Sequence, residues 1–193
     1  MTKAELRQIF LARRKSLSPA ARRAASEAIS RLFFQNFDLR PVHFLHCFLP
    51  IEKFDEIDTK LIFEKIWREY PGVETIVPRV DFRTGELESL KFTPATALLE
   101  NRWQIREPAT NETIETNKID VVLIPLLCFD ARGARVGYGK GFYDRFLKNC
   151  RADCVKIGLS HFAPVAKIED AGDFDVKLDF CITPQTVFHH RAK

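Results

Sequence analysis

The chain has 193 residues, of which 46% are hydrophobic and 29% are charged, and these values are typical of a globular domain that folds without disulfides or a structural metal. Its formal net charge of +4 suits an anionic ligand but is too small to indicate strong nucleic-acid binding. No stretch approaches the ~20 apolar residues of a membrane span, and the N-terminus lacks the apolar core of a signal peptide.

The first part of the chain predicts three helices and one strand. One face of the first helix is marked by apolar residues at helical spacing: Leu6, Ile9, Phe10 and Leu17. Ser18 before Pro19 is typical of an N-cap and a first helical residue, and it begins a second helix that reaches about residue 35. A strand is expected over residues 42–49, and a third helix begins at Asp58 and Thr59.

The rest of the chain predicts more strands and one short helix. Residues 74–80 and 87–92 are expected to form a hairpin around a turn at residues 83–86. Residues 93–118 are polar and weakly patterned, which is typical of a functional or partly ordered connection. The remaining strands are expected at residues 121–124, within an apolar run that reaches Phe129, and at residues 155–159 and 178–182.

Strands that alternate with helices predict an α/β fold: a layered, mostly parallel sheet flanked by helices. We expect one domain over residues 1–193, with an N-terminal helical pair at about residues 3–35. Ligands of such sheets bind beyond the carboxyl ends of the strands. The run 121–129 leads directly into the most glycine-rich segment of the chain, so we expect the site at that edge, together with the loop after Leu49.

Half of the glycines, four of eight, lie within residues 133–141, between this run and a short helix marked by Phe142, Phe146 and Leu147. Glycine lets backbone amides approach a ligand closely and adopt positive φ. The start of the helix adds unpaired N–H groups and a partial positive charge. Cations are interspersed with the glycines: Arg132, Arg135, Lys140 and Arg145. The segment therefore predicts a phosphate site.

Two common phosphate-binding motifs do not fit this loop. In a Walker A loop Lys140 would be followed by Ser or Thr, and here Gly141 follows. In a dinucleotide fingerprint Phe142 would be a glycine. A tight strand-to-helix turn with solvated charges is the alternative, but the clustering of glycines, cations, aromatic residues and Asp144 favours a site. Asp144 suits Mg²⁺ beside phosphates, or it is a helix-start carboxylate that interacts with the helix dipole.

The run from Phe129 to Leu147, Phe-Asp-x-x-Gly-x-Arg-Val-Gly-x-Gly-x-Gly-Phe-Tyr-Asp-Arg-Phe-Leu, resembles the signature of the 5-formyltetrahydrofolate cyclo-ligase (methenyltetrahydrofolate synthetase) family. Other segments resemble the family in the same order along nearly the whole chain. They are Lys3-x-x-Leu6-Arg7, Glu56-Ile-Asp-Thr59, Trp103-x-Ile-x-Glu-Pro108 and Asp175-Val-x-Leu-Asp179-x-x-Ile-Thr183.

The resemblance implies a three-layer Rossmann-like scaffold and an ATP- and Mg²⁺-dependent ligase. Such an enzyme converts 5-formyltetrahydrofolate to 5,10-methenyltetrahydrofolate and releases ADP and phosphate. It implies that the formyl oxygen is phosphorylated first and that a neighbouring folate nitrogen then closes the ring as phosphate leaves.

The resemblance also implies roles for individual residues. Those that would bind ATP are Lys3, Arg7, Arg135, Gly137, Tyr138, Gly139, Lys140, Gly141, Phe142 and Tyr143. Those that would bind the folate are Leu49, Glu56, Trp103 and Tyr143. Asp144 and Asp175 would hold Mg²⁺, and Arg135, Lys140 and Tyr143 would be catalytic. Asp173 is a rival of Asp175, and Glu52 and Asp55 are rivals of Glu56.

Two other functions remain open from the residues alone. One is a non-catalytic module that binds a phosphorylated ligand or RNA, but such a module has no need of Asp144 beside the loop. The other is an isomerase or transferase on a similar scaffold. We expect no nucleic-acid or membrane partner, and a monomer or a weak homo-oligomer.

The five cysteines bear on the environment of the protein. Their number is odd and most lie in apolar runs, which favours reduced thiols and a cytoplasmic protein. Cys150 and Cys154 could be half of a zinc site, but no second pair with ligand spacing follows, so we do not expect zinc.

Overall fold

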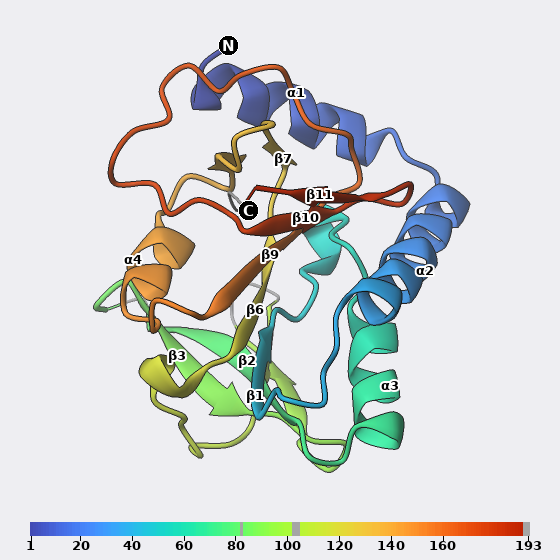
Figure 1. Cartoon of the computed structure of the whole chain (residues 1–193), viewed down its shortest axis with the longest axis vertical. Helices are drawn as coiled ribbons and strands as arrows, with labels where there is room; N and C mark the ends of the chain where they lie inside the picture. The colour runs from blue at the N-terminus through green and yellow to red at the C-terminus, as the bar shows by residue number, and fades with distance from the viewer. Residues whose placement is uncertain (82, 102–104, 191–193) are drawn as a thin grey trace.

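The computed structural model describes residues 1–81, 83–101 and 105–190, which form one α/β domain around a seven-stranded sheet of order β11-β10-β9-β6-β1-β2-β3 (Figure 1). The strands of this sheet are β1 (Phe44–Cys47), β2 (Glu74–Asp81), β3 (Glu86–Lys91), β6 (Val121–Pro125), β9 (Val155–Leu159), β10 (Phe180–Ile182) and β11 (Val187–His189). The expected class, a mostly parallel sheet flanked by helices, is confirmed.

The centre of the sheet is parallel and its two edges are antiparallel. β1 pairs in parallel with β2 and β6, β6 with β9, and β9 with β10. The edge strands β3 and β11 pair antiparallel with β2 and β10. The carboxyl ends of β1, β6 and β9 therefore meet at one edge, and the loops that leave them lie side by side.

Helices cover both faces of the sheet, which explains why its central strands are apolar without alternation. On one face, α2 (Pro19–Asn36) and α3 (Lys60–Glu69) bury Ile29, Phe33 and Ile66 against the sheet. On the other face, α4 (Phe142–Lys148) buries Phe146 and Leu147 against Val122 and Ile124 of β6, among other residues.

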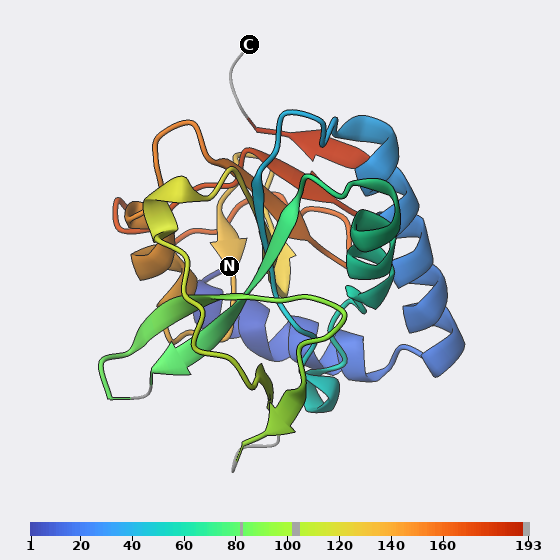
Figure 2. The same ribbon diagram turned by 90° about the horizontal axis from the view of Figure 1, so that it is seen from below.

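Helix α1 (Lys3–Lys15) crosses the end of the sheet where these carboxyl termini meet (Figures 1 and 2). It begins with a capping box, in which Thr2 and Glu5 satisfy each other's backbone N–H groups. Leu6 and Phe10 are buried as expected, but Ile9 is 40% exposed. Arg14 is buried one helical turn after Phe10, with only 3% of its surface exposed.

The strand expected at residues 121–124 is β6, but the rest of the apolar run to Phe129 does not continue it. β6 ends at Pro125, Leu126 packs in the core beneath α4, and Leu127 packs in a third core beneath α1. β7 (Cys128–Phe129) then pairs antiparallel with β8 (Arg135–Val136). The run is continuously apolar because it lines two cores in succession, and the glycine loop leaves β8 rather than β6.

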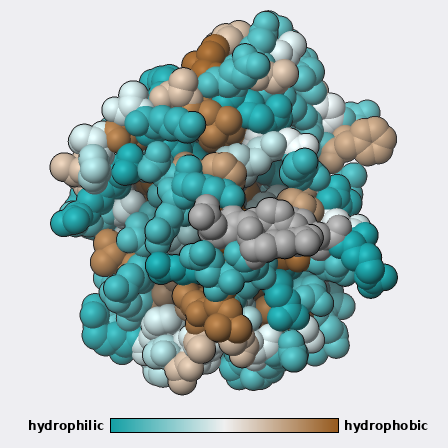
Figure 3. Space-filling view, turned by 180° about the vertical axis from the view of Figure 1, so that it is seen from behind, coloured by the Kyte–Doolittle hydropathy of each residue, from teal (hydrophilic) through white to brown (hydrophobic). Residues whose placement is uncertain are grey.

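Smaller elements complete the fold. Residues 93–118 contain a short hairpin of β4 (Leu98–Glu100) and β5 (Arg106–Pro108) and the 3₁₀ turn η2 (Thr116–Lys118). A second 3₁₀ turn, η1 (Glu52–Phe54), follows β1. The face seen in Figure 3 is mainly hydrophilic, with apolar side chains in separate groups. Among the described residues, no helix has both the length and the hydrophobicity needed to cross a bilayer.

Candidate active site

The glycine loop joins β8 to α4 and requires glycine at two of its positions. Gly139 has φ of +90° and Gly141, the N-cap of α4, has φ of +68°. A Cβ atom on Gly139 would lie 3.0 Å from Cζ of Arg7. Gly137 is different, because no heavy atom lies within 4 Å of the place of its missing Cβ. The loop is thus close against α1 at Gly139 and open beside Gly137.

Positive side chains lie on both sides of this loop. Arg7 of α1 donates a hydrogen bond from Nε to the carbonyl of Gly137, at 2.9 Å. Lys140 is exposed, and its side chain forms no ion pair with any residue that the structure describes. Arg145 donates instead to the carbonyls of Lys140 and Gly85, at 3.2 and 2.6 Å, and so ties α4 to the turn between β2 and β3. Arg132 faces Asp130 at 3.6 Å, away from the loop.

A buried ion pair connects β8 to α4. Nη2 of Arg135 lies 2.8 Å from Oδ1 of Asp144, and only 6% of the Arg135 side chain is exposed. Arg135 also donates to the carbonyl of Val176, whose amide donates to Asp144 at 3.2 Å. Burial lowers the pKa of Arg135, although the negative charges of Asp144 and Asp175 oppose this shift.

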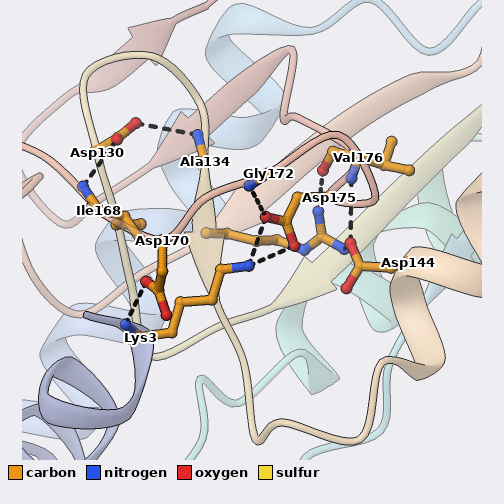
Figure 4. Close-up of polar contacts among 10 residues, drawn as sticks. Lys3, Asp130, Ala134, Asp144, Ile168, Asp170, Gly172, Asp175 and Val176 are labelled. Atoms are coloured by element: carbon orange, nitrogen blue, oxygen red, sulfur yellow. Dashed lines mark hydrogen bonds and ion pairs between the residues drawn. The ribbon is translucent and has the colours of Figure 1, made fainter.

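A second ion pair connects the start of α1 to the acidic loop at residues 168–176 (Figure 4). Lys3 Nζ contacts Oδ1 of Asp175 at 2.6 Å, and the Lys3 amide donates to Asp170 at 2.7 Å. Partial burial would raise the pKa of Asp175, but the Lys3 hydrogen bond, the Gly172 amide and nearby positive charge outweigh it and the pKa is lowered. Asp175 is therefore ionised and close to Arg135.

These two carboxylates fit Mg²⁺ to different degrees. Mg²⁺ is usually held by one or two protein carboxylates together with substrate phosphates, and within the described ranges no group of three or more potential ligands is found. Asp144 fits this mode, because the bonds it receives from Arg135 and Val176 both go to Oδ1. Asp175 accepts from Lys3 on both oxygens and from Gly172 on Oδ2, so it would have to exchange a bond with Lys3 to bind a metal.

Glu56 is buried on the other side of the loop. Its Oε2 accepts from the Ile51 amide at 2.7 Å, and its Oε1 accepts from the Tyr138 hydroxyl at 2.6 Å. Burial raises the pKa of Glu56, even though Tyr138, Ile51 and Arg14 act in the opposite direction. The Tyr138 side chain therefore points to the residue predicted to bind the folate, and its ring stacks on Phe54 at 4.7 Å.

The rivals of Glu56 and Asp175 are placed less favourably. Glu52 is exposed and pairs with Arg106 at 3.2 Å, and Asp55 pairs with Arg22 at the same distance. Asp173 is exposed on the acidic loop. Of these carboxylates in the loop after β1, Glu56 is the buried one.

Tyr143 of α4 packs edge-on against the rings of His46 and Phe146. Its hydroxyl is buried and has no hydrogen-bond partner among the residues described. Burial raises its pKa well above the ordinary value, nearby Cys47 and Glu56 raise it further, and Arg135 opposes them. A buried phenol hydroxyl without a partner is costly, so this group requires an account from the function of the site.

Three buried polar residues near the site were not predicted. Arg14 contacts Tyr138, His161 donates from Nε2 to the Asp55 carbonyl at 3.2 Å, and the ring of His46 lies 4.7 Å from that of Phe146. Burial lowers the pKa of His46 to about 3. Burial and the charge of Arg14 lower that of His161 to about 4. Both imidazoles are therefore neutral.

The remaining predicted residues are placed as follows. Leu49 is half-buried and packs against the core under α2 and α3. Phe142 is half-buried, with the Arg145 guanidinium 5.4 Å from its ring centroid. Trp103 lies outside the described residues. The five cysteines are free thiols, and four of them are buried.

Comparisons with known proteins show the family of the chain. The model of the 5-formyltetrahydrofolate cyclo-ligase family matches residues 1–184. The 5-formyltetrahydrofolate cyclo-ligase of Escherichia coli K12 is 30% identical over 182 residues, which cover 91% of this chain and 97% of that protein. A 5,10-methenyltetrahydrofolate synthetase from Aquifex aeolicus superposes with a TM-score of 0.79 at 28% identity, covering 100% of this chain and 95% of that one. The Mycoplasma pneumoniae synthetase superposes with a TM-score of 0.73 at 26% identity, covering 95% and 99%.

Proposed function

The chain belongs to the 5-formyltetrahydrofolate cyclo-ligase family, and from this premise we propose that it converts 5-formyltetrahydrofolate and ATP to 5,10-methenyltetrahydrofolate, ADP and phosphate, with Mg²⁺. The formyl oxygen attacks the γ-phosphorus of ATP, and the bond from that phosphorus to the ADP oxygen breaks. The neighbouring folate nitrogen then attacks the formyl carbon and loses its proton. Phosphate leaves as the C–O bond breaks, which closes the ring.

The phosphate side of the proposed site is the positive one. Phosphoryl transfer depends mainly on positioning and on stabilising negative charge. Lys3, Arg7 and Arg135 surround the loop, and the exposed Lys140 is free to reach the triphosphate. The loop backbone at residues 137–142 would lie along the phosphates, with the open space beside Gly137 as the point of closest approach.

Asp144 is the proposed Mg²⁺ ligand, with Asp175 as a second ligand that would first release Lys3. Bound there with the triphosphate, Mg²⁺ supplies charge neutralisation worth several kcal/mol. Before ligands bind, the ion pairs of Asp144 with Arg135 and of Asp175 with Lys3 keep both carboxylates oriented toward the loop.

The folate side of the proposed site is the buried carboxylate. A carboxylate accepts hydrogen bonds on both oxygens, which suits the paired N–H donors of an aminopyrimidinone ring. Glu56 would accept them, Leu49 would border the same pocket, and Trp103 and Tyr143 would offer flat surfaces to the folate rings.

The observation that carries the proposal is the place of Tyr143. Its hydroxyl is buried and unbonded within the described part of the chain, and Tyr143 directly precedes Asp144, which pairs with Arg135. A formyl group held between Glu56 and the phosphate loop would come to this hydroxyl. We therefore assign Tyr143 as a donor to the formyl or transferring oxygen, and Arg135 and Lys140 as stabilisers of the transferring phosphoryl group.

The enzyme is further proposed to act as one catalytic domain over residues 1–193, as a monomer or a weak homo-oligomer. Its cysteines are free thiols, which is typical of proteins in the reducing environment of the cytoplasm. This environment would also keep the half-buried Cys150 reduced.

The test is an absorbance assay for the conjugated methenyl product. Purified protein is mixed with 5-formyltetrahydrofolate, ATP and Mg²⁺, and each component is omitted in turn. Product that requires all three would support the reaction. A folded protein that binds ATP but gives no product would contradict it, and folate-independent ATP hydrolysis would favour a different acceptor.

A further inference from the structure

Arg14 is a buried cation that joins three segments of the site. Its Nη1 donates to the Tyr138 hydroxyl at 2.8 Å and lies 3.3 Å from the carbonyl oxygen of Phe54. Its Nη2 donates to the carbonyl of Leu126. These partners lie in the glycine loop, in the loop after β1 and just after β6. One side chain of α1 therefore holds together the ends of two central strands and the phosphate loop.

The charge of Arg14 has no directly bonded anion in the described part of the chain. Burying a guanidinium without a compensating charge is costly. The carboxylate that stands nearest through the hydrogen-bond network is Glu56, which shares the Tyr138 hydroxyl with Arg14. Arg14 and Glu56 thus form a buried pair of opposite charges separated by one phenol oxygen.

The direction of both bonds follows from chemistry. Arginine only donates and an ionised carboxylate only accepts. The Tyr138 hydroxyl has one proton, so it must donate this proton to Glu56 and accept from Arg14 with a lone pair. The order Arg14 to Tyr138 to Glu56 is therefore fixed, and replacing Tyr138 by phenylalanine would break both bonds at once.

We propose that Arg14 and Tyr138 are positioning residues for the folate: they hold the Glu56 carboxylate in one orientation, ready to accept the pterin N–H donors. This role rests on the proposed function, in which Glu56 binds the pterin. The Tyr138 hydroxyl fixes Oε1 and the Ile51 amide fixes Oε2, so the carboxylate plane is set before the substrate arrives. Pre-set acceptors cost less entropy when a ligand binds.

The network acts on the folate side and not on the phosphate side. The hydrogen bonds of Arg14 reach none of the charged side chains on the phosphate side, which are Lys3, Arg7, Arg135, Lys140, Asp144 and Asp175. Burial disfavours the charged form of Glu56, whereas Tyr138 and Arg14 favour it. Losing either partner would leave a carboxyl that is more often protonated and accepts poorly from the pterin.

The experiment compares four variants with the wild-type chain. Tyr138→Phe keeps the ring that stacks on Phe54 and removes only the hydroxyl. Arg14→Lys keeps the charge, and Arg14→Met removes it. Arg13→Met is the matched control, because Arg13 is the exposed neighbour on the same helix and lies over the rings of Phe10 and Phe162. Calorimetry gives the Kd of 5-formyltetrahydrofolate, steady-state kinetics give KM for each substrate, and thermal unfolding checks the fold.

In Tyr138→Phe we expect the Kd and KM for 5-formyltetrahydrofolate to rise about tenfold, as for loss of a hydrogen bond to a charged group, with KM for ATP changing less than about twofold. Arg14→Met should match or exceed this loss, Arg14→Lys should lose less, and Arg13→Met should resemble the wild type.

Three results would overturn the proposal. They are an unchanged folate Kd in a folded Tyr138→Phe, equal losses of folate and ATP affinity, and an Arg14→Lys variant that is as weak as Arg14→Met. A wild-type chain that does not bind 5-formyltetrahydrofolate would overturn the proposed function together with this role. A wild-type chain that binds and turns over, with an unchanged Tyr138→Phe, would overturn this role alone.

Discussion

Arg135 and Asp144 face each other at 2.8 Å across the glycine loop, one at its start in β8 and the other in the first turn of α4. The pair is only partly open to solvent, since 6% of the Arg135 side chain and 33% of the Asp144 side chain are exposed. Asp144 thus has two roles in the proposed enzyme. Its Oδ1 pairs with the buried guanidinium of Arg135, and its Oδ2 is available to a metal.

The substitution Asp144→Asn separates these roles. The amide oxygen can still accept from Arg135 and from the Val176 amide, so we expect the fold to survive with a modest fall in the melting temperature. The negative charge proposed to hold Mg²⁺ is lost, so kcat should fall by at least about 100-fold, as when several kcal/mol of charge stabilisation are removed. Thermal unfolding and the absorbance assay over a range of Mg²⁺ concentrations check both parts, and near-normal turnover would contradict the metal role.

Lys140→Ala tests the phosphate role of the loop. Lys140 is exposed and forms no ion pair with the described residues, so its loss should leave the free energy of unfolding unchanged. We expect KM for ATP to rise about tenfold, the usual effect of losing one charge-assisted contact, and KM for the folate to change much less. Lys15→Ala, at the exposed end of α1, is the control for a simple loss of positive charge. A larger effect on the folate than on ATP would show that the loop is wrongly assigned.

The sequence predicted much of this site because its central motif is local. The glycines, Arg135, Lys140 and Asp144 lie within a dozen residues, so the loop is recognisable without knowing the fold. Glu56 and Asp175 depend on the resemblance to a family, because an isolated acidic residue in a polar loop carries no signal of burial. The structure buries Glu56 at 9% exposure and leaves its neighbour Asp55 in an ion pair with Arg22.

The burial of Arg14 is indicated by its spacing in the sequence. It follows Leu6 and Phe10 at intervals of four residues, and residues at that spacing share one face of a helix. A basic residue in register with two buried apolar residues indicates a buried cation, which in turn requires a polar partner. The partner, Tyr138, is more than one hundred residues away, and only the fold brings the two together.

The split of the run 121–129 could not be predicted from hydropathy. A strand covered on both faces and a segment that passes from one core to another have the same uninterrupted apolar pattern. The two-residue strands β7 and β8 are too short to have a periodicity. The buried side chain of Asp130 holds their turn instead. Its Oδ1 accepts from the amide of Arg132 and from that of Ala134, and Figure 4 shows the bond to Ala134.

The raised pKa of Glu56 predicts a pH dependence of folate binding. The carboxylate accepts from the pterin only when ionised, and burial places its pKa above the ordinary 4.5. Affinity for 5-formyltetrahydrofolate should therefore fall as the pH is lowered, and the fall should begin at a higher pH than for an exposed glutamate. Glu56→Gln should raise KM for the folate about tenfold or more, leave KM for ATP nearly unchanged, and remove this acidic fall. Calorimetry between pH 5 and 8 measures the Kd of the folate for the wild type and for Glu56→Gln. If both show the same pH dependence, the titrating group is not Glu56.

Substitution by alanine should affect stability differently at Gly139 and at Gly137. At Gly139 the positive φ and the Arg7 guanidinium 3.0 Å from a new Cβ both oppose alanine, so Gly139→Ala should cost about 1–2 kcal/mol of stability. At Gly137 the space for a Cβ is open and φ is not positive, so Gly137→Ala should leave the melting temperature within a degree or two of the wild type.

The same pair tests where the phosphates lie. If the triphosphate approaches the backbone beside Gly137, a methyl group there would occupy its space, and Gly137→Ala should raise KM for ATP about tenfold or more without loss of stability. Gly139→Ala should combine a lower melting temperature with weaker ATP binding, because it also displaces Arg7 from the Gly137 carbonyl. Thermal unfolding with and without ATP distinguishes the two variants. Unchanged ATP affinity in Gly137→Ala would indicate that the phosphates bind away from this part of the loop, nearer to Lys3 and the acidic segment that it contacts.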